Sequence, residues 1–222
     1  MTQKTKLLKK TSVKQKTVVK KSVIMQKQMP KQVSREVKVE SNKGKAPEIE
    51  IVNMVVSTSL KHDIPLEKMA ATLPNTEYNP EQFPGLVLRI KDPKTSALIF
   101  SSGNVVCTGA RSMEKVHESI KKIIKNLEKL NIKITITPEV IVQNIVGSGS
   151  IFMDLNLNKL AMILPNVEYE PEQFPGLVYK LPGTNATFLL FSNGKIVCTG
   201  TKSKEEAEAS VLKLVENLKK YV

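Results

Sequence analysis

The sequence predicts an α+β fold in which an antiparallel sheet carries helices on one of its faces. Three observations support this prediction: a long internal duplication, several β-rich runs in each copy, and two helical stretches in each copy. A chain of 222 residues has room for one large domain or two small ones. Strands and amphipathic helices in this order pack as a sheet with helices layered on one side.

The duplication is the most informative feature of the chain. Asn53 in IVNMVV matches Asn144 in VQNIVG, 91 residues later. The same offset relates EYNPEQFPGLV to EYEPEQFPGLV and SSGNVVCTG to SNGKIVCTG, and it holds without a gap as far as Ser112. A unit this long, present only twice, indicates a duplicated half-domain rather than a solenoid. Two similar halves can pack about a pseudo-two-fold axis, as an isologous dimer does.

Each copy begins with a strand, a short helix and three further strands. The first strand covers 49–58, with 140–146 as its counterpart, and the short helix covers 65–73 or 157–164. Pro65 suits the first turn of a helix. The three strands cover 86–91, 96–101 and 104–109, with counterparts at 177–181, 186–192 and 195–200. The sequences SSGN and SNGK supply hairpin turns between strands.

A long helix closes each copy. In the first copy, apolar residues recur at helical spacing, namely Val116, Ile120, Ile123, Ile124, Leu127 and Leu130. In the second copy we expect a helix over 204–221 with Val211, Leu214, Val215 and Leu218 facing inward.

The positive charge is concentrated at the N-terminus. Of the net +13, residues 1–46 contribute +12, because they hold 14 Lys or Arg and only Glu36 and Glu40 as acids. This segment lacks aromatic residues and any sustained period, so we expect a disordered basic tail over 1–47. The first repeat then covers 48–137 and the second 138–222. The tail either clamps nucleic-acid phosphates without sequence preference or serves only as a solubilising extension.

Several function classes lack residues to support them. Cys107 and Cys198 have no nearby metal-ligand partners, and His62 and His117 share no motif, so we expect no metal and no cofactor. There are no paired carboxylates, no nucleophile with its base and no glycine-rich phosphate loop, so we expect neither an enzyme nor a small-molecule substrate. No apolar run could span a bilayer or form a signal-peptide core. We therefore expect an intracellular soluble protein without a membrane partner.

Both faces of the predicted sheet are apolar. Side chains alternate along a strand, so Asn53 and Val55 share one face, while Val106 and Thr108 share a face opposite to Cys107. One set lines the core beneath the helices, where the cysteines act as small buried hydrophobes. The other set leaves an apolar face without helices, which normally marks a binding site. Alternatively, a second sheet or another subunit covers it.

Six motifs in fixed order connect the chain to a known family. They are IVNMVV, EQFPGLVLRI, ALIFSSGNVVCTG, IVQNIVGSG, EQFPGLVYKL and FLLFSNGKIVCTG, and they lie between residues 48 and 222. In these motifs the chain resembles the TATA-binding protein family, and EQFPGLV in both copies is more similar to archaeal members. The resemblance implies a two-repeat pseudo-symmetric saddle: a curved ten-stranded antiparallel sheet with four helices on the convex face. Its concave face then sits on the DNA minor groove and kinks the duplex by about 80°, a known property of this family.

The resemblance also implies roles for individual residues. The phenylalanines that wedge between base pairs are matched by Phe83, Phe100, Phe174 and Phe191. The minor-groove contacts are matched by Asn53, Val55, Pro84, Leu98, Val106, Thr108, Asn144, Val146, Pro175, Leu189, Val197 and Thr199. The phosphate contacts are matched by Arg89, Lys180 and Lys195, although Lys180 replaces a common Arg and Asn104 replaces a common Lys. The contact with transcription factor B is matched by Glu170, Glu172 and Gln173.

These roles together predict a general transcription initiation factor. It would bind double-stranded A·T-rich promoter DNA and recruit transcription factor B and, through it, RNA polymerase. It would act on the nucleoid in the cytoplasm of an archaeon, or in the nucleus of a eukaryote. One alternative is a generic nucleic-acid-binding module of the same fold, without promoter specificity and with little bending. Another is an enzyme or small-ligand binder that uses the open sheet, for which the sequence offers no supporting motif.

The two interpretations of the tail make different predictions for salt dependence. If the tail contacts phosphates, removal of residues 1–46 lowers the dependence of DNA affinity on salt concentration, because fewer counterions are released on binding. The preference for A·T-rich sites should remain. Titrations of both proteins at several salt concentrations measure the two slopes, and an unchanged slope would favour the solubilising interpretation.

Overall fold

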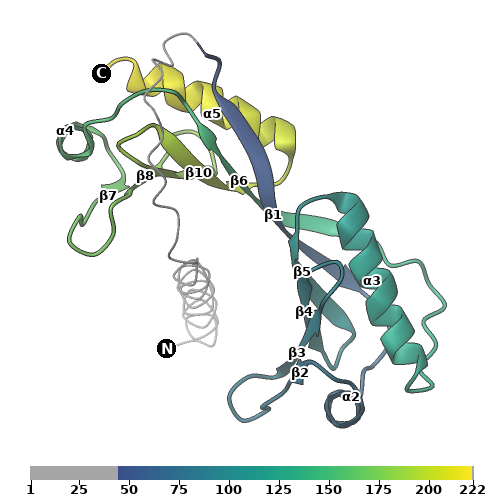
Figure 1. The fold of residues 1–222 in the computed structure, drawn as a ribbon. Coiled ribbons are helices and arrows are strands. Elements are labelled where there is room, and N and C mark those ends of the chain that lie inside the picture. Colours follow the sequence, from purple (N-terminus) through teal and green to yellow (C-terminus); the bar gives the residue numbers. More distant parts are fainter. Residues whose placement is uncertain (1–44, 222) are drawn as a thin grey trace, which may run out of the picture. The chain divides into compact units, whose positions relative to one another are not determined.

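The computed structural model describes residues 45–221, so the predicted tail lies almost entirely outside the described residues. Within them, ten strands form a single antiparallel sheet in the order β2-β3-β4-β5-β1-β6-β10-β9-β8-β7 (Figure 1). The first repeat supplies the first five strands of this order and the second repeat supplies the other five. The order of the second five is the reverse of the first, which confirms the predicted pseudo-two-fold arrangement of the duplication.

The elements of the two repeats correspond one to one. The first repeat contains β1 (Glu48–Ser59), α2 (Leu66–Thr72), β2 (Thr76–Glu77), β3 (Gly85–Ile90), β4 (Thr95–Phe100), β5 (Asn104–Ala110) and α3 (Met113–Glu128). The second contains β6 (Ile141–Ser150), α4 (Leu157–Ile163), β7 (Val167–Glu168), β8 (Leu177–Lys180), β9 (Thr187–Leu190), β10 (Lys195–Thr201) and α5 (Lys204–Leu218). The predicted elements are all present, with bounds shifted by a few residues.

The two repeats meet at the centre of the sheet, where β1 pairs with β6. The register is reciprocal: Asn53 is opposite Val146, and Val55 is opposite Asn144. Strand β6 extends to Ser150, four residues beyond the predicted end, because the N-terminal part of β1 pairs with it. Gly149 permits this close approach, since a Cβ atom there would lie 1.8 Å from the backbone oxygen of Glu48. The GSGS sequence carries no strand-like alternation of apolar residues, which is why the prediction stopped short.

Two of the strands were not predicted from the residue patterns. Strands β2 and β7 are two residues long and form the outer edges of the sheet. A segment of two residues is too short to show a period, and short edge strands also limit unwanted pairing with other chains. The ten strands implied by the family resemblance are nevertheless all present.

The core lies on one face of the sheet, beneath the helices. In β5 and β10, Cys107 and Cys198 are almost fully buried, as alternation predicted. Burial raises the pKa of both thiols, that of Cys198 to about 12. Tyr179 is also fully buried, and its hydroxyl accepts a hydrogen bond of 2.8 Å from Asn217 Nδ2 in α5. The helices therefore cover only the face that carries these side chains.

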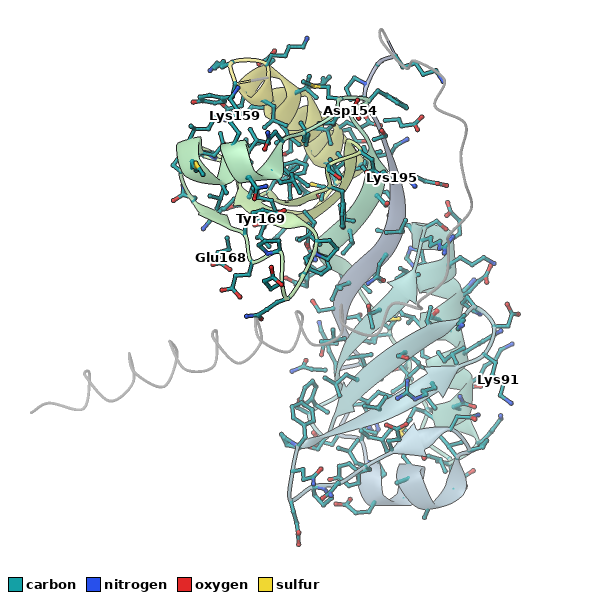
Figure 2. The ribbon with its side chains drawn as sticks, turned by 60° about the vertical axis from the view of Figure 1, so that its left-hand side comes forward. Lys91, Asp154, Lys159, Glu168, Tyr169 and Lys195 are labelled. Atoms are coloured by element: carbon teal, nitrogen blue, oxygen red, sulfur yellow. The ribbon has the colours of Figure 1, made fainter. Side chains whose placement is uncertain are left out.

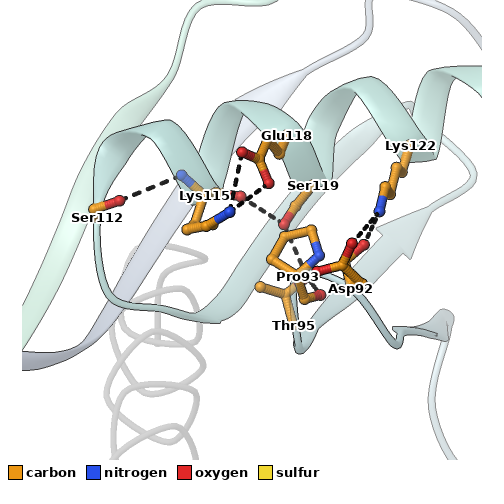
Figure 3. Close-up of polar contacts among 8 residues, drawn as sticks. All are labelled: Asp92, Pro93, Thr95, Ser112, Lys115, Glu118, Ser119 and Lys122. Atoms are coloured by element: carbon orange, nitrogen blue, oxygen red, sulfur yellow. Dashed lines mark hydrogen bonds and ion pairs between the residues drawn. The ribbon is translucent and has the colours of Figure 1, made fainter.

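Polar contacts attach α3 to the sheet at defined points (Figure 3). Ser112 caps its N-terminus by accepting from the backbone N–H of Lys115, and Ser119 lies 2.9 Å from the Thr95 hydroxyl in β4. One turn further on, Lys122 contacts Asp92 in the β3–β4 turn. Thr95 and Ser119 are buried, so their mutual hydrogen bond satisfies groups that water cannot reach. The helix is thereby fixed above β4 and β5.

Among the described helices, none combines the length and the apolar character required to cross a membrane.

Candidate nucleic-acid interface

The predicted groove residues lie on the face of the sheet opposite the helices. In β1, β4 and β5, the residues Val55, Leu98 and Val106 are half-buried and alternate with fully buried core residues. The matching residues of the second repeat, Val146, Leu189 and Val197, alternate in the same way. All described strands belong to one sheet, so no second sheet from this part of the chain covers that face. This surface, defined by the half-buried strand residues, is called the open face below.

Apolar side chains form a row across the open face in each repeat. Val87 in β3 is opposite Leu98 in β4, which in turn is opposite Val106 in β5. In the second repeat the corresponding row is formed by Val178, Leu189 and Val197. Val87 and Val178 were not among the predicted groove residues. Their position two residues before Arg89 and Lys180 in a strand could have identified them.

A polar cluster lies at the centre of the face in each repeat. The side-chain oxygen of Asn53 accepts a 2.7 Å hydrogen bond from the backbone N–H of Gly109, and Asn53 Nδ2 donates to Thr108 Oγ1 at 3.2 Å. In the second repeat, Asn144 makes the same contacts with Gly200 and Thr199, at 2.8 and 3.0 Å. Sequence reasoning placed the asparagines and threonines on this face, but it did not foresee the backbone contact.

This backbone contact fixes which way each amide points. A backbone N–H can only donate, so the amide atom that faces it is the oxygen. The Nδ2 group is then directed to the threonine hydroxyl, and it has a second hydrogen to donate. The centre of the open face is therefore a donor surface set among valines and leucines.

A pair of phenylalanine rings lies at each end of the open face. The rings of Phe83 and Phe100 have their centroids 6.0 Å apart at an interplanar angle of 60°, and those of Phe174 and Phe191 are 6.0 Å apart at 67°. Edge-to-face packing of this kind is favourable between aromatic rings. Phe174 is 44% exposed, so a large apolar ring faces solvent at that end. The structure thus brings together both predicted pairs.

A glycine beneath each ring pair makes room for it. A Cβ atom on Gly85 would lie 2.7 Å from Phe83 and 3.2 Å from Phe100, and one on Gly176 would lie 2.6 Å from Phe174. Such separations are shorter than van der Waals contact, so any side chain there would displace the rings. The glycine of EQFPGLV therefore has a steric role that the sequence alone did not reveal.

A tight turn positions the first phenylalanine of each pair, which is half-buried at Phe83 and exposed at Phe174. The backbone N–H of Phe174 donates to the Glu170 oxygen at 2.9 Å, and that of Phe83 donates to the Asn79 oxygen at 2.9 Å. Pro84 and Pro175 follow the phenylalanines and are exposed. In the second repeat this turn, residues 170–174, also carries the predicted partner residues Glu170, Glu172 and Gln173, which are all exposed. The same turn thus carries both the ring of Phe174 and the exposed acidic side chains.

The predicted phosphate-binding residues lie at the margins of the face and differ in their contacts. Arg89 makes a bidentate ion pair with Glu77 in β2, at 3.0 and 3.3 Å, which raises the pKa of Arg89 and lowers that of Glu77. Sequence reasoning did not anticipate this pairing. Lys180 and Lys195 are exposed in the second repeat, and Lys195, labelled in Figure 2, is opposite Ser150 of β6, which separates it from the first residue of β1. The Nε and Nη2 groups of Arg89 are engaged with a carboxylate.

The clusters of the two repeats thus form one surface with matching halves. Its middle donates hydrogen bonds, its flanks are aliphatic, its ends are aromatic, and cations stand at its margins. No group of three or more potential metal ligands occurs among residues 45–221. The arrangement is suited to contact with a long, narrow, acceptor-rich partner.

Comparison with known proteins identifies the family. The family model for transcription factor TFIID, or TATA-binding protein, matches residues 48–130 and again 139–221. The TATA-box-binding protein of Thermococcus kodakarensis is 48% identical over 173 residues, covering 78% of this chain and 91% of the relative. That of Haloarcula marismortui is 51% identical over 172 residues, covering 77% and 92%. The solved structure of Methanococcus jannaschii TBP is 48% identical, with a TM-score of 0.73, and the match covers 78% of this chain and 99% of that one. With both of its repeats matched, this chain belongs to the TATA-binding protein family.

Proposed function

We propose that this protein is a general transcription initiation factor that binds the minor groove of TATA-like promoter DNA, kinks it with phenylalanine wedges, and recruits transcription factor B and thereby RNA polymerase. The observation that carries the proposal is the open face, where two donor clusters and two ring pairs are set in an otherwise aliphatic surface. Membership of the family and the naming of its archaeal relatives as TATA-box-binding proteins support the choice of DNA as partner.

The chemistry of the open face accounts for a preference for A·T pairs. In the minor groove, A·T and T·A pairs present only acceptors, whereas a G·C pair adds the amino group of guanine as a donor. The clusters at Asn53 and Asn144 present donors, which complement adenine N3 and thymine O2. A guanine amino group would face another donor or an aliphatic side chain and would lose its water without gaining a partner. Discrimination thus follows from an unpaired group rather than from a specific hydrogen-bond code.

The ring pairs supply the means of kinking. Each pair would enter a base step at one end of the element and partly unstack it, at a cost of a few kcal/mol per step. The kink opens the groove onto the sheet, so that the rows Val87–Leu98–Val106 and Val178–Leu189–Val197 can bury apolar area against it. Burial at roughly 25 cal/mol per Å² offsets the unstacking. A generic nucleic-acid module would gain no such contact and would leave the duplex nearly straight.

Removal of one ring pair should reduce the bend of the DNA more strongly than it reduces binding. We expect Phe174→Ala with Phe191→Ala to lower the bend to roughly half, since one of two kinks is lost, and the same changes at Phe83 and Phe100 to have a matching effect. Energy transfer between dyes at the two DNA ends measures the bend, and a gel-shift assay compares a TATA element with a G·C-rich control. Circular dichroism of each variant verifies the fold. Equal affinity for the two duplexes, or an unchanged bend in both double variants, would refute the proposed function.

The glycine beneath each ring pair offers a more conservative test. We expect Gly176→Ala to reduce the bend and weaken binding by about tenfold, which corresponds to about 1.4 kcal/mol, because the added methyl group displaces the rings of Phe174 and Phe191. Gly149 provides no useful control, since its Cβ would meet backbone. Ala209→Gly, at an exposed position of α5, changes one methyl group away from the open face and should leave the bend unaltered. A normal bend in Gly176→Ala would show that the ring positions are not critical.

The acidic turn of the second repeat is the proposed contact for transcription factor B. Glu170 and Glu172 are exposed there, whereas the corresponding turn of the first repeat carries Asn79 and Glu81. The second turn therefore presents more negative charge than the first. Charge complementarity chiefly sets partner choice and association rate, so a basic partner would select the second repeat.

Charge reversal at matched positions tests this contact. We expect Glu170→Lys with Glu172→Lys to prevent formation of the complex with transcription factor B on promoter DNA. The matched variant Asn79→Lys with Glu81→Lys should form that complex normally. Both variants carry lysines at the same two positions of their repeats, and the DNA affinity of each, measured without transcription factor B, corrects for the difference in charge change. Footprints with and without transcription factor B distinguish the cases, and equal recruitment by the two variants would argue against the second repeat as the docking site.

A further inference from the structure

Each repeat places a carboxylate at the margin of the open face, on its short edge strand. In the first repeat, Glu77 of β2 is opposite Val87 of β3. In the second, Glu168 of β7, labelled in Figure 2, is opposite Val178 of β8. Opposite residues of an antiparallel pair lie on the same face, so both carboxylates lie on the face that carries the valines. A negative charge at this margin repels a polyanion unless a cation accompanies it.

The two repeats differ in the cation that accompanies the carboxylate. In the first repeat, Glu77 accepts hydrogen bonds from Nε and Nη2 of Arg89, at 3.0 and 3.3 Å. In the second repeat, Lys180 stands in place of the arginine, and no ion pair of the described residues joins it to Glu168. An ammonium group is a point charge on a flexible stem, whereas a guanidinium group is a rigid fork. Of the two margins, the first therefore has a fork that is held in a defined orientation.

The carboxylate engages one edge of the fork and leaves the other edge available. Arginine carries five N–H donors, of which Glu77 engages one on Nε and one on Nη2. Both donors of Nη1 and the second donor of Nη2 are directed elsewhere, because the guanidinium group is planar. These donors form the kind of edge that binds a phosphate with two parallel hydrogen bonds. The ion pair thus orients the guanidinium group without using up its capacity for an anion.

Arg89 also lies at the place where a DNA backbone would pass. It is opposite Ser96 of β4, which is opposite Thr108 of β5, so a row of residues leads from the central donor cluster to the margin. If the cluster contacts base edges, the sugar-phosphate backbone that flanks those bases meets the end of this row. The side chains of Arg89 and Glu77 are 58% and 64% exposed, and an ion pair between exposed groups contributes little to folding. Its effect is therefore to be sought in binding.

We propose that Glu77 is a positioning residue for DNA binding, which holds the guanidinium group of Arg89 so that the free edge of the fork binds a backbone phosphate. The inference rests on the proposed function, because it requires DNA on the open face. A side chain that is already oriented loses less freedom when the phosphate arrives. The second repeat makes a looser contact through the ammonium group of Lys180, and there the charge of Glu168 opposes binding.

Matched substitutions of the two carboxylates should differ in their effects. We expect Glu77→Gln, in the full-length protein, to weaken binding to an A·T-rich duplex by about three- to tenfold, because the DNA alone then has to order the guanidinium group. Glu168→Gln removes the same charge from the equivalent position and should leave the affinity unchanged or raise it, since it removes a repulsion. Gel-shift titrations measure both affinities. Thermal unfolding of both variants should match that of the parent protein, because the ion pair is exposed.

Removal of the guanidinium group separates positioning from a structural role of Glu77. In the background Arg89→Gln, the further change Glu77→Gln should strengthen binding, because the carboxylate there is an unpaired charge beside the phosphates. If Glu77 served only to maintain β2, its substitution would cost the same affinity with or without Arg89.

The Nε–H signal of Arg89 in a nitrogen–proton correlation spectrum reports on the pair directly. The chain has three arginines, so such signals are few, and Arg89→Lys identifies the one from Arg89. On DNA, we expect this proton to exchange with water slowly in the parent protein and rapidly in Glu77→Gln, because the carboxylate keeps Nε while the phosphate binds the other edge.

Each outcome decides between the two proposals. An unchanged or higher affinity in Glu77→Gln, an equal loss in Glu168→Gln, a loss that persists without Arg89, or slow exchange of the Arg89 proton in Glu77→Gln on DNA overturns the positioning role. Those results leave the proposed function intact, provided that the parent protein binds the A·T-rich duplex more tightly than a G·C-rich duplex of equal length. Equal binding of the two duplexes by the parent protein overturns both.

Discussion

The whole architecture depends on a sheet that is covered by helices on only one side. A sheet has two faces whose apolar side chains need to be covered. The four described helices bury their apolar residues against only one of them. The opposite face still carries valine, leucine and phenylalanine at alternate positions. An aliphatic surface of this kind is unfavourable in water, and its free energy is recovered when a partner covers it. The uncovered apolar area of the open face is thus a source of favourable free energy for the binding of a partner.

Two glycine positions in each repeat show how backbone geometry supports this surface. Gly85 and Gly176 lie directly beneath the ring pairs, so the rings rest on bare backbone. Gly109 and Gly200 contribute a different property, since each offers a backbone N–H that fixes the amide of the neighbouring asparagine. The phenylalanine rings and the amide groups are therefore held by main chain as well as by neighbouring side chains, which would limit the freedom that they lose on binding a partner.

Much of the fold could be predicted from the sequence because the duplication supplied each element twice. The alternation around Cys107 and Cys198 correctly separated the buried face from the open face, and the helical spacing from Val116 to Leu127 correctly located α3. Strands β2 and β7 were missed by the residue patterns because two residues show no period. The extension of β6 was missed because Gly147 and Gly149 are explained only by the close packing of β1 against them. This contact joins segments about 100 residues apart in the sequence.

The candidate site was less accessible to sequence reasoning than the fold. Alternation identified which residues share a face, but the Arg89–Glu77 ion pair joins β3 to an edge strand that no pattern revealed. The likeness between the halves also concealed differences, such as Asn79 against Glu170, whose meaning depends on the turn that exposes them. The roles of the phenylalanines, asparagines and cations in binding remain predictions that the experiments above address.

The pairing of β1 with β6 has a mechanical consequence. These strands run through the middle of the sheet, and their ladder extends from Glu48 opposite Ser150 to Ser57 opposite Ile141. The two halves are thus joined by a paired ladder, which is interrupted by register shifts between Ile51 and Asn53 and between Val55 and Val56. If the open face binds a duplex as proposed, a sheet whose halves are paired in this way would change its shape less readily than the duplex, which would then bear most of the deformation. The stiffness of the duplex would in that case contribute to selection, and easily deformed steps would be favoured even where no side chain touches them.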